Sequence, residues 1–351
     1  MLNHKHYVPV LKGKAGDFWA IQNLKQDTRG RVTPLIEVVP PSAKMSEEDR
    51  LDGTARCIST HWPDEPCFVD LIWRDNSPML HHEHVVDFFF RRARSRALHA
   101  VPVTALARSP AYQQAVARVV EQDGKGMAIR LGVSFVDDLA TAGRLLDALL
   151  GVTKTNHEHV DMIIEAGSVT ATPAAMLRTT WREAIDVLPH LERWRSVTVL
   201  AGSFPASLAG LPQATWSTIR RREWDAWSDL VGSQSLARKP TYADYVIGDP
   251  IVPFSGQAAI AANLRYSTPS DFLVWRGYAV NNHPLGFGQI HTICADLVRR
   301  DEFSGADFSR GDFEIQQRAA NQDSPGNAQQ WRQWATNHYI ELVSSQVANL
   351  L

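Results

Sequence analysis

Residues 160–166 have the sequence VDMIIEA, a short apolar run that ends next to an acidic residue, Glu165. A helical pattern with several leucines near one face precedes it at 137–150, and a second short apolar run, 127–133 (MAIRLGV), precedes that helix. Apolar runs of this length, rich in β-branched residues, are typical of buried parallel strands. The order strand, helix, strand therefore predicts a right-handed βαβ unit.

The same alternation extends in both directions along the chain. Strand-like runs occur at 7–11, 33–38, 67–72, 100–105, 127–133, 160–166, 196–201 and 242–248. Helical patterns occur at 17–25, 46–59, 80–98, 111–122, 137–150, 173–188 and 214–231. Eight such units favour a (β/α)8 TIM-like barrel, because closure removes both edges of the sheet. An open doubly wound sheet is the alternative for the same alternation.

The pattern changes after the eighth strand-like run. Residues 258–267 and 271–280 flank the turn Thr268-Pro269-Ser270 and are predicted to form a β-hairpin. A helix is expected at 286–300, closing the barrel, and an amphipathic helix at 327–350. We therefore expect a barrel over residues 1–300, including a hairpin at 258–280, and a C-terminal helical extension over 301–351.

Composition narrows the class of protein. The chain has 351 residues and a net charge of −2, so no overall basic field indicates a nucleic-acid partner. Its three cysteines form no CxxC pair, which argues against a zinc knuckle or a disulfide framework. Residues 1–14 lack an apolar core of signal-peptide length, and no apolar run approaches the ~20 residues of a membrane span. A cytoplasmic protein is expected.

Charged residues stand at the ends of several predicted strands, and strand ends converge on the C-terminal mouth of a barrel, where binding and catalytic groups gather. The predicted set comprises Lys12, Lys14, Glu37, Asp70, Arg130, Glu165 and Asp249. In the functional interpretation, Glu37, Asp70 and Glu165 act as general bases or hold Mg²⁺, while the cations and Asp249 bind a ligand. In the structural interpretation, the same charges neutralise one another as buried ion pairs.

The predicted hairpin carries a second set of candidate residues. Arg265 and Tyr266 lie on one strand, and Trp275 and Arg276 lie on the other. Two arginines beside two aromatic rings form a plausible clamp for a planar or phosphorylated ligand, since guanidinium groups bind phosphate and stack on rings. The alternative is a solvated hairpin with one aromatic side chain packed on the barrel.

The opening sequence YVPVLKGK (7–14), the following Trp19-Ala20 and PLIEV (34–38), together with Trp275-Arg276-Gly277, resemble the bacteriophage beta protein family. The resemblance extends over nearly the whole chain. It implies a component of phage-carried or anti-phage gene cassettes, without implying a defined reaction. It also favours Lys12, Lys14 and Glu37 as site residues.

Two functional hypotheses follow. In the first, the barrel mouth binds a small anionic ligand, such as a nucleotide or a phosphodiester, in an antiviral setting and hydrolyses it or only binds it. In the second, a non-catalytic barrel binds a protein partner or neutralises a toxin of the same cassette through its tryptophan-rich helices and C-terminal tail, an idea motivated by 11 tryptophans. The sequence does not decide whether the protein is an enzyme.

Overall fold

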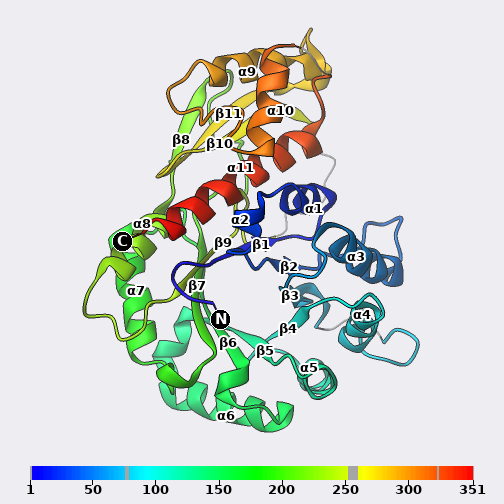
Figure 1. The fold of residues 1–351 in the computed structure, drawn as a ribbon, viewed down its shortest axis with the longest axis vertical. Helices are drawn as coiled ribbons and strands as arrows, with labels where there is room; N and C mark the ends of the chain where they lie inside the picture. The colour runs from blue at the N-terminus through cyan, green and yellow to red at the C-terminus, as the bar shows by residue number, and fades with distance from the viewer. Residues whose placement is uncertain (1, 76–78, 252–259, 322–323, 351) are drawn as a thin grey trace.

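The computed structural model describes residues 2–75, 79–251, 260–321 and 324–350. Eight parallel strands form a closed barrel in the order β1-β2-β3-β4-β5-β6-β7-β9, with β1 paired to β9 (Figure 1). The strands are β1 (Tyr7–Leu11), β2 (Leu35–Glu37), β3 (Cys67–Asp70), β4 (Ala100–Ala105), β5 (Met127–Gly132), β6 (Val160–Ser168), β7 (Ser196–Gly202) and β9 (Thr241–Asp244). The predicted (β/α)8 barrel is confirmed, and the sheet is not open.

Helices surround the barrel on its outside (Figure 1). They are α1 (Ala15–Gln22), α2 (Gln26–Arg29), α3 (Glu47–His61), α4 (Val85–Arg94), α5 (Pro110–Asp123), α6 (Leu139–Thr153), α7 (Ala174–Asp186) and α8 (Arg222–Gly232). Local capping explains where several begin: Ser46 accepts from the Asp49 N–H, and Ser109 accepts from the Tyr112 N–H. No helix of the described ranges has the length and apolar content that crossing a membrane requires.

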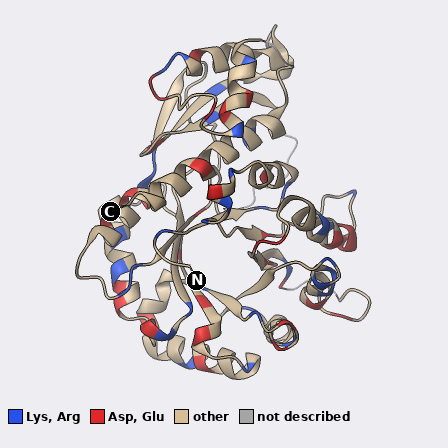
Figure 2. Cartoon of the chain, viewed as in Figure 1, with Lys and Arg blue, Asp and Glu red and all other residues tan. Residues whose placement is uncertain are grey.

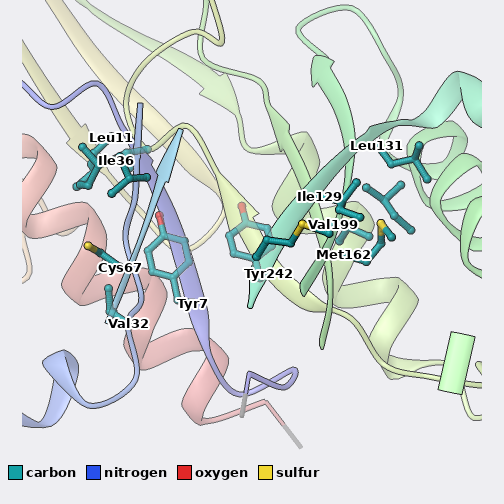
Figure 3. Packing of buried hydrophobic residues seen from close by; sticks show 14 of the residues in the cluster. Tyr7, Leu11, Val32, Ile36, Cys67, Ile129, Leu131, Met162, Val199 and Tyr242 are labelled. Carbon is teal, nitrogen blue, oxygen red and sulfur yellow. The ribbon is translucent and has the colours of Figure 1, made fainter. Parts of the chain in front are cut away.

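The alternation of side chains along each strand separates two hydrophobic layers. One set points into the barrel and includes Val10, Phe68, Ala128, Ile163 and Ala243. The other set points outward and packs under the helices, as Figure 3 shows for Tyr7, Ile36, Ile129, Met162 and Tyr242. Both faces of each strand are therefore buried, which is why the strands read as continuous apolar runs.

A second sheet stands beside the barrel. Its strands are β8 (Trp216–Arg220), β10 (Ala261–Ser267) and β11 (Asp271–Ala279), paired antiparallel in the order β10-β11-β8. It is accompanied by α9 (Gln289–Val298), α10 (Arg310–Ala319) and α11 (Ala328–Ala348), and the two layers share a separate hydrophobic cluster. The predicted hairpin after the eighth strand is thus present as β10 and β11, although residues 258 and 259 of its first predicted strand lie outside the described residues.

Three predictions about individual elements were wrong. The helix expected at 214–231 is two elements, because Trp216–Arg220, rich in aromatic and β-branched residues, adds to the second sheet as β8 and α8 begins only at Arg222. The helix expected at 286–300 does not close the barrel; as α9 it packs on β10 and α10. The eighth barrel strand ends at Asp244 rather than continuing to residue 248.

Helix α11 joins the barrel to the second sheet. It packs against α1 and β1 on one side and against β10 on the other, and Figure 1 shows it lying between them. Asn337 Nδ2 donates to the Ala20 carbonyl at 2.9 Å, and the Tyr339 hydroxyl donates to buried Asp244. The division of the chain at residue 300 stays a prediction, but the second hydrophobic cluster contains residues from both sides of that position.

Candidate functional site

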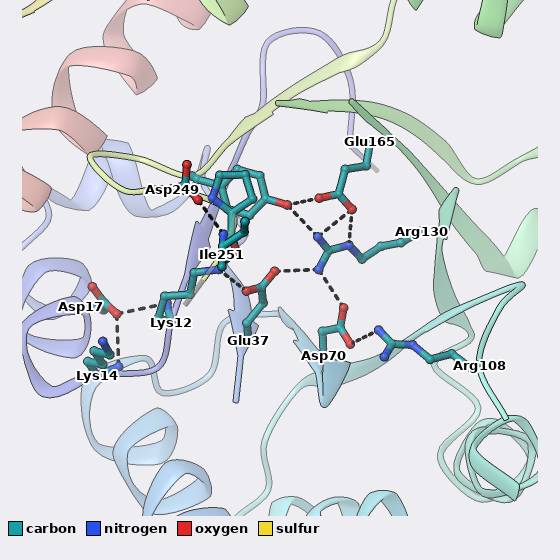
Figure 4. Close-up of polar contacts among 12 residues, drawn as sticks. Lys12, Lys14, Asp17, Glu37, Asp70, Arg108, Arg130, Glu165, Asp249 and Ile251 are labelled. Carbon is teal, nitrogen blue, oxygen red and sulfur yellow. Dashed lines mark hydrogen bonds and ion pairs between the residues drawn. The ribbon is translucent and has the colours of Figure 1, made fainter. Parts of the chain in front are cut away.

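The two-residue period of the strands places a layer of polar side chains above the apolar layer inside the barrel. Each polar residue lies two positions after an inward-facing apolar one, as Arg130 follows Ala128 and Glu165 follows Ile163. The same spacing gives the pairs Val10 and Lys12, Leu35 and Glu37, Phe68 and Asp70, and Ala243 and Tyr245. The C-terminal mouth of the barrel is therefore filled by a network of charged and polar groups, which we call the Arg130 network (Figure 4).

Arg130 lies at the centre of this network and is nearly fully buried. Its Nη1 donates to Glu37 Oε1 at 2.7 Å and to Asp70 Oδ2 at 2.9 Å. Its Nε donates to Glu165 Oε2 at 2.9 Å, and its Nη2 donates to the Tyr245 hydroxyl at 2.8 Å. The Tyr245 hydroxyl in turn donates to Glu165 Oε1. Every edge of the guanidinium group is thus occupied by the protein itself.

Two further cations complete the pairing of the carboxylates. Lys12 Nζ donates to Glu37 Oε2 at 2.5 Å and to the Pro250 carbonyl at 2.6 Å. Arg108 Nη2 donates to Asp70 Oδ1 at 3.1 Å. Three cations, Lys12, Arg108 and Arg130, therefore face three carboxylates, so the Arg130 network is neutral as a whole.

Burial and pairing shape the titration of this network. Burial opposes the charge of Arg130, but Tyr245 and the surrounding carboxylates outweigh it and hold the pKa of Arg130 well above its usual value. Burial raises the pKa of Asp70, although the guanidinium groups of Arg130 and Arg108 act in the opposite direction. The geometry leaves the three predicted catalytic carboxylates, Glu37, Asp70 and Glu165, held by cations. Across the described ranges, no group of three or more His, Cys, Asp or Glu side chains is arranged as a metal site.

Two other predicted residues lie beside this network without joining it. Lys14 is exposed, and its backbone N–H donates to Asp17 Oδ2 at 3.1 Å. Asp249 Oδ1 accepts from the Ile251 N–H at 2.9 Å, in the segment that follows β9. The structure thus brings Lys12, Glu37, Asp70, Arg130 and Glu165 together as the sequence predicts and leaves Lys14 and Asp249 at the rim.

The four residues predicted to form a clamp on the hairpin are separated. Tyr266 is fully buried, donates to Asp312 Oδ1 at 2.8 Å and stacks on His338. Trp275 packs edge-on against Trp216. Arg276 Nη1 donates to the carbonyls of Ala209 and Leu211 at 2.9 and 2.7 Å, which fixes that loop.

Arg265, the remaining clamp residue, lies in a different environment. Its Nη1 donates to the Ile247 carbonyl at 2.8 Å, and its guanidinium stacks 4.7 Å from the Phe204 ring. It lines a cavity of about 210 Å³ between β10 and the first turns of α11. The described residues lining this cavity, here called the arginine pocket, are Ala261, Asn263, Arg265, Ala328, Trp331 and Arg332.

The arginine pocket contains two guanidinium groups and no acidic side chain among its described lining residues. Arg332 approaches the barrel rim at Gly248. If a Cβ atom were added to that glycine, it would lie 2.9 Å from the Nη2 of Arg332. In the described chain, neither Arg332 nor Arg265 forms an ion pair with a carboxylate. Burial first, and then the charge of Arg332, lower the pKa of Arg265 to about 9. Partial desolvation of the Lys14 side chain and the charge of Arg332 also lower the pKa of Lys14, so a third cation lies nearby.

Three residues of these sites were missed by sequence reasoning. Tyr245 was foreseeable, because it follows the strand 241–244 with the inward spacing of Ala243. Arg108 lies in the loop after β4, and Arg332 lies within α11, and neither position carries a local signal.

The fold and site define a closed (β/α)8 barrel with a self-paired polar mouth and a cationic pocket at its rim. The chain belongs to the Beta protein family, whose sequence profile matches residues 7–345. A search of curated protein sequences found no match. Among solved structures, the chain is similar to triosephosphate isomerase from Bartonella henselae, with 10% identity and a TM-score of 0.36, over 68% of this chain and 92% of that chain. The closed order of eight parallel strands, and not that similarity, defines the fold.

Proposed function

We propose that this Beta family protein binds a small anionic ligand in the arginine pocket at the rim of the barrel mouth. The observation that carries the proposal is the pair of guanidinium groups of Arg265 and Arg332, which share a cavity with no acidic side chain among its described lining residues. Proteins rarely leave two guanidinium groups together in a half-enclosed space, because desolvation and mutual repulsion both oppose it. A bound anion removes the repulsion and satisfies the free donors.

We propose that the protein binds this anion and does not hydrolyse it. A hydrolytic mechanism needs a carboxylate or other base free to take a proton, and the predicted candidates are engaged by cations in the Arg130 network. The setting that we propose is cytoplasmic and phage-related, which the family resemblance supports.

The rival hypothesis of a protein partner loses its main motivation. It relied on tryptophans as contact residues, but Trp224, Trp227, Trp331 and Trp334 are all buried in the core of the chain itself. Lys, Arg, Asp and Glu residues are interspersed over the barrel helices in Figure 2, without a basic stripe in that view to favour nucleic acid.

Isothermal titration with inorganic phosphate and sulfate tests the proposal. Wild-type protein should bind at least one of the two anions. Arg332→Gln should weaken binding about tenfold or more, since a hydrogen bond to a charged group is worth ~1.5–3 kcal/mol. Arg265→Gln should have a similar effect.

Arg299→Gln is the matched control. It removes one positive charge at a side chain that is 73% exposed and lies outside the lining of the pocket. It should bind the anion as wild type does. The proposal is wrong if wild type binds neither anion, or if Arg332→Gln and Arg265→Gln both fold and bind like Arg299→Gln.

A further inference from the structure

We infer that the ligand of the arginine pocket is a small phosphate monoester, bound as the dianion, and not a phosphodiester or a nucleotide. This inference rests on the proposed function and narrows it. Four features of the pocket carry it: the charge of its lining, its hydrogen-bond donors, its size and the character of its remaining walls.

The charge of the pocket favours a dianion. Two guanidinium groups line the cavity, and Lys14 lies close enough to Arg332 for their charges to interact. No acidic side chain is among the described residues that line the cavity. A phosphate monoester carries a charge of about −1.5 to −2 at neutral pH, whereas a diester or a carboxylate carries only one negative charge. A dianionic monoester matches the two positive charges of the lining arginines.

The donors of the pocket also fit phosphate. Guanidinium groups pair with phosphate oxygens through parallel N–H donors, and a terminal phosphate offers three oxygens to two such groups. The Nη1 of Arg265 donates to the Ile247 carbonyl, and its Nη2 donates to no residue of the described chain. Arg332 likewise donates to no residue of the described chain. Donors therefore remain on both arginines.

The size of the pocket limits what accompanies the phosphate. Its volume of about 210 Å³ is below the ~300–1,000 Å³ of pockets that bury drug-sized ligands. A phosphate with a few additional atoms fits this space, whereas a phosphate with ribose and a base does not fit inside it.

The remaining walls indicate an uncharged substituent. Ala261, Ala328 and Trp331 contribute small or aromatic surfaces. The Trp331 ring is held in place because its Nε1 donates to the Pro325 carbonyl at 2.8 Å and its face tilts against Phe287. Asn263 is the one polar member of the remaining described lining, so these walls offer mainly apolar contact and no further charge to the part of the ligand next to the phosphate.

A minimal set of ligands tests this inference on the full chain. Methyl phosphate, dimethyl phosphate and AMP differ in charge and in size, and their binding is measured by isothermal titration at pH 7.5. Methyl phosphate should bind at least tenfold more tightly than dimethyl phosphate and no more weakly than AMP. Because the second pKa of a phosphate monoester is about 6, methyl phosphate should bind about fourfold more weakly at pH 5.5 than at pH 7.5.

Two substitutions test whether the preference for the monoester arises in the arginine pocket. Arg332→Gln should lose the preference for methyl phosphate over dimethyl phosphate, and Arg299→Gln should keep it. Tighter binding of AMP would overturn the assignment of a small ligand, and equal binding of the mono- and diester would overturn the monoester assignment; either result leaves anion binding intact. Absence of binding by every phosphate compound, and by sulfate, would overturn the proposed function as well.

Discussion

The Arg130 network and the arginine pocket lie at the same end of the barrel and both contain two arginines, but their electrostatic balance is opposite. In the network, each of Lys12, Arg108 and Arg130 meets a carboxylate within 3.1 Å. In the pocket, Arg265 and Arg332 share a cavity without an acid among its described lining residues. The comparison shows that a cation near a barrel mouth indicates a ligand site only when the fold has left it unpaired.

The comparison also separates structural from functional charge. Taking ions out of water is costly, and the cost is recovered only where partners and hydrogen bonds are complete. The Arg130 network meets that condition within the protein. The arginine pocket meets it only when a ligand supplies the negative charge.

Replacing the central arginine of the network should have the largest effect. Arg130→Met leaves Glu37 and Asp70 buried without their shared partner, which is expected to lower the free energy of unfolding by about 3–5 kcal/mol. Urea denaturation followed by tryptophan fluorescence measures this change. The control is Arg118→Met, at a side chain that is 55% exposed and paired with Asp87, where ~0–1 kcal/mol is expected. Equal effects of the two substitutions would show that the network does not stabilise the barrel.

A buried acid without a cationic partner should make stability depend on pH. Glu223 is fully buried, forms no ion pair among the described residues, and has a pKa raised to about 7 by burial and by Asp244. The folded state therefore keeps a proton that the unfolded chain releases, so this residue contributes stability below pH ~4.5 that is lost as the pH rises to about 7.

Glu223→Gln tests this dependence. The variant should lack that part of the slope and should exceed wild type by on the order of 1–3 kcal/mol above pH 7, measured by urea denaturation at several pH values. Glu121→Gln, at a side chain that is 65% exposed, should follow the wild-type profile. A variant whose slope between pH 4.5 and 7 equals that of wild type would remove Glu223 as its source.

The smallest effect is expected in the pocket without ligand. Arg332→Gln removes a charge that repels Arg265 and Lys14 and that pairs with no carboxylate of the described chain. The unliganded variant should be as stable as wild type or more stable by up to ~1 kcal/mol, because no attraction is lost. Differential scanning calorimetry in an anion-free buffer measures this. A loss of stability of 2 kcal/mol or more would mean that Arg332 has a structural partner.

The sequence was sufficient for the barrel and for most of the Arg130 network, for a physical reason. Buried parallel strands are recognisable as short apolar runs, and the two-residue period fixes which end residues point inward, as for Glu37 and Arg130. The sequence left open whether these charged residues pair with one another, because ion pairing depends on distances between strands, which no local pattern encodes.

The arginine pocket was only partly predictable. Arg265 was named from its place on the hairpin, but its partner Arg332 lies 67 positions further along the chain, on a helix whose packing on β10 is a tertiary feature. For the same reason, Tyr266 and Trp275 were expected to contact a ligand, whereas they pack inside the protein. Tyr266 and Trp275 lie next to arginines in the sequence, but each packs in a core that the alternation of the strand separates from its neighbour.

The most direct test of the account is the location of a bound anion. A crystal of the protein soaked in tungstate, a tetrahedral dianion, should give a strong anomalous peak between Arg265 and Arg332 and none within the Arg130 network. A peak on the guanidinium group of Arg130 with the arginine pocket empty would contradict the account.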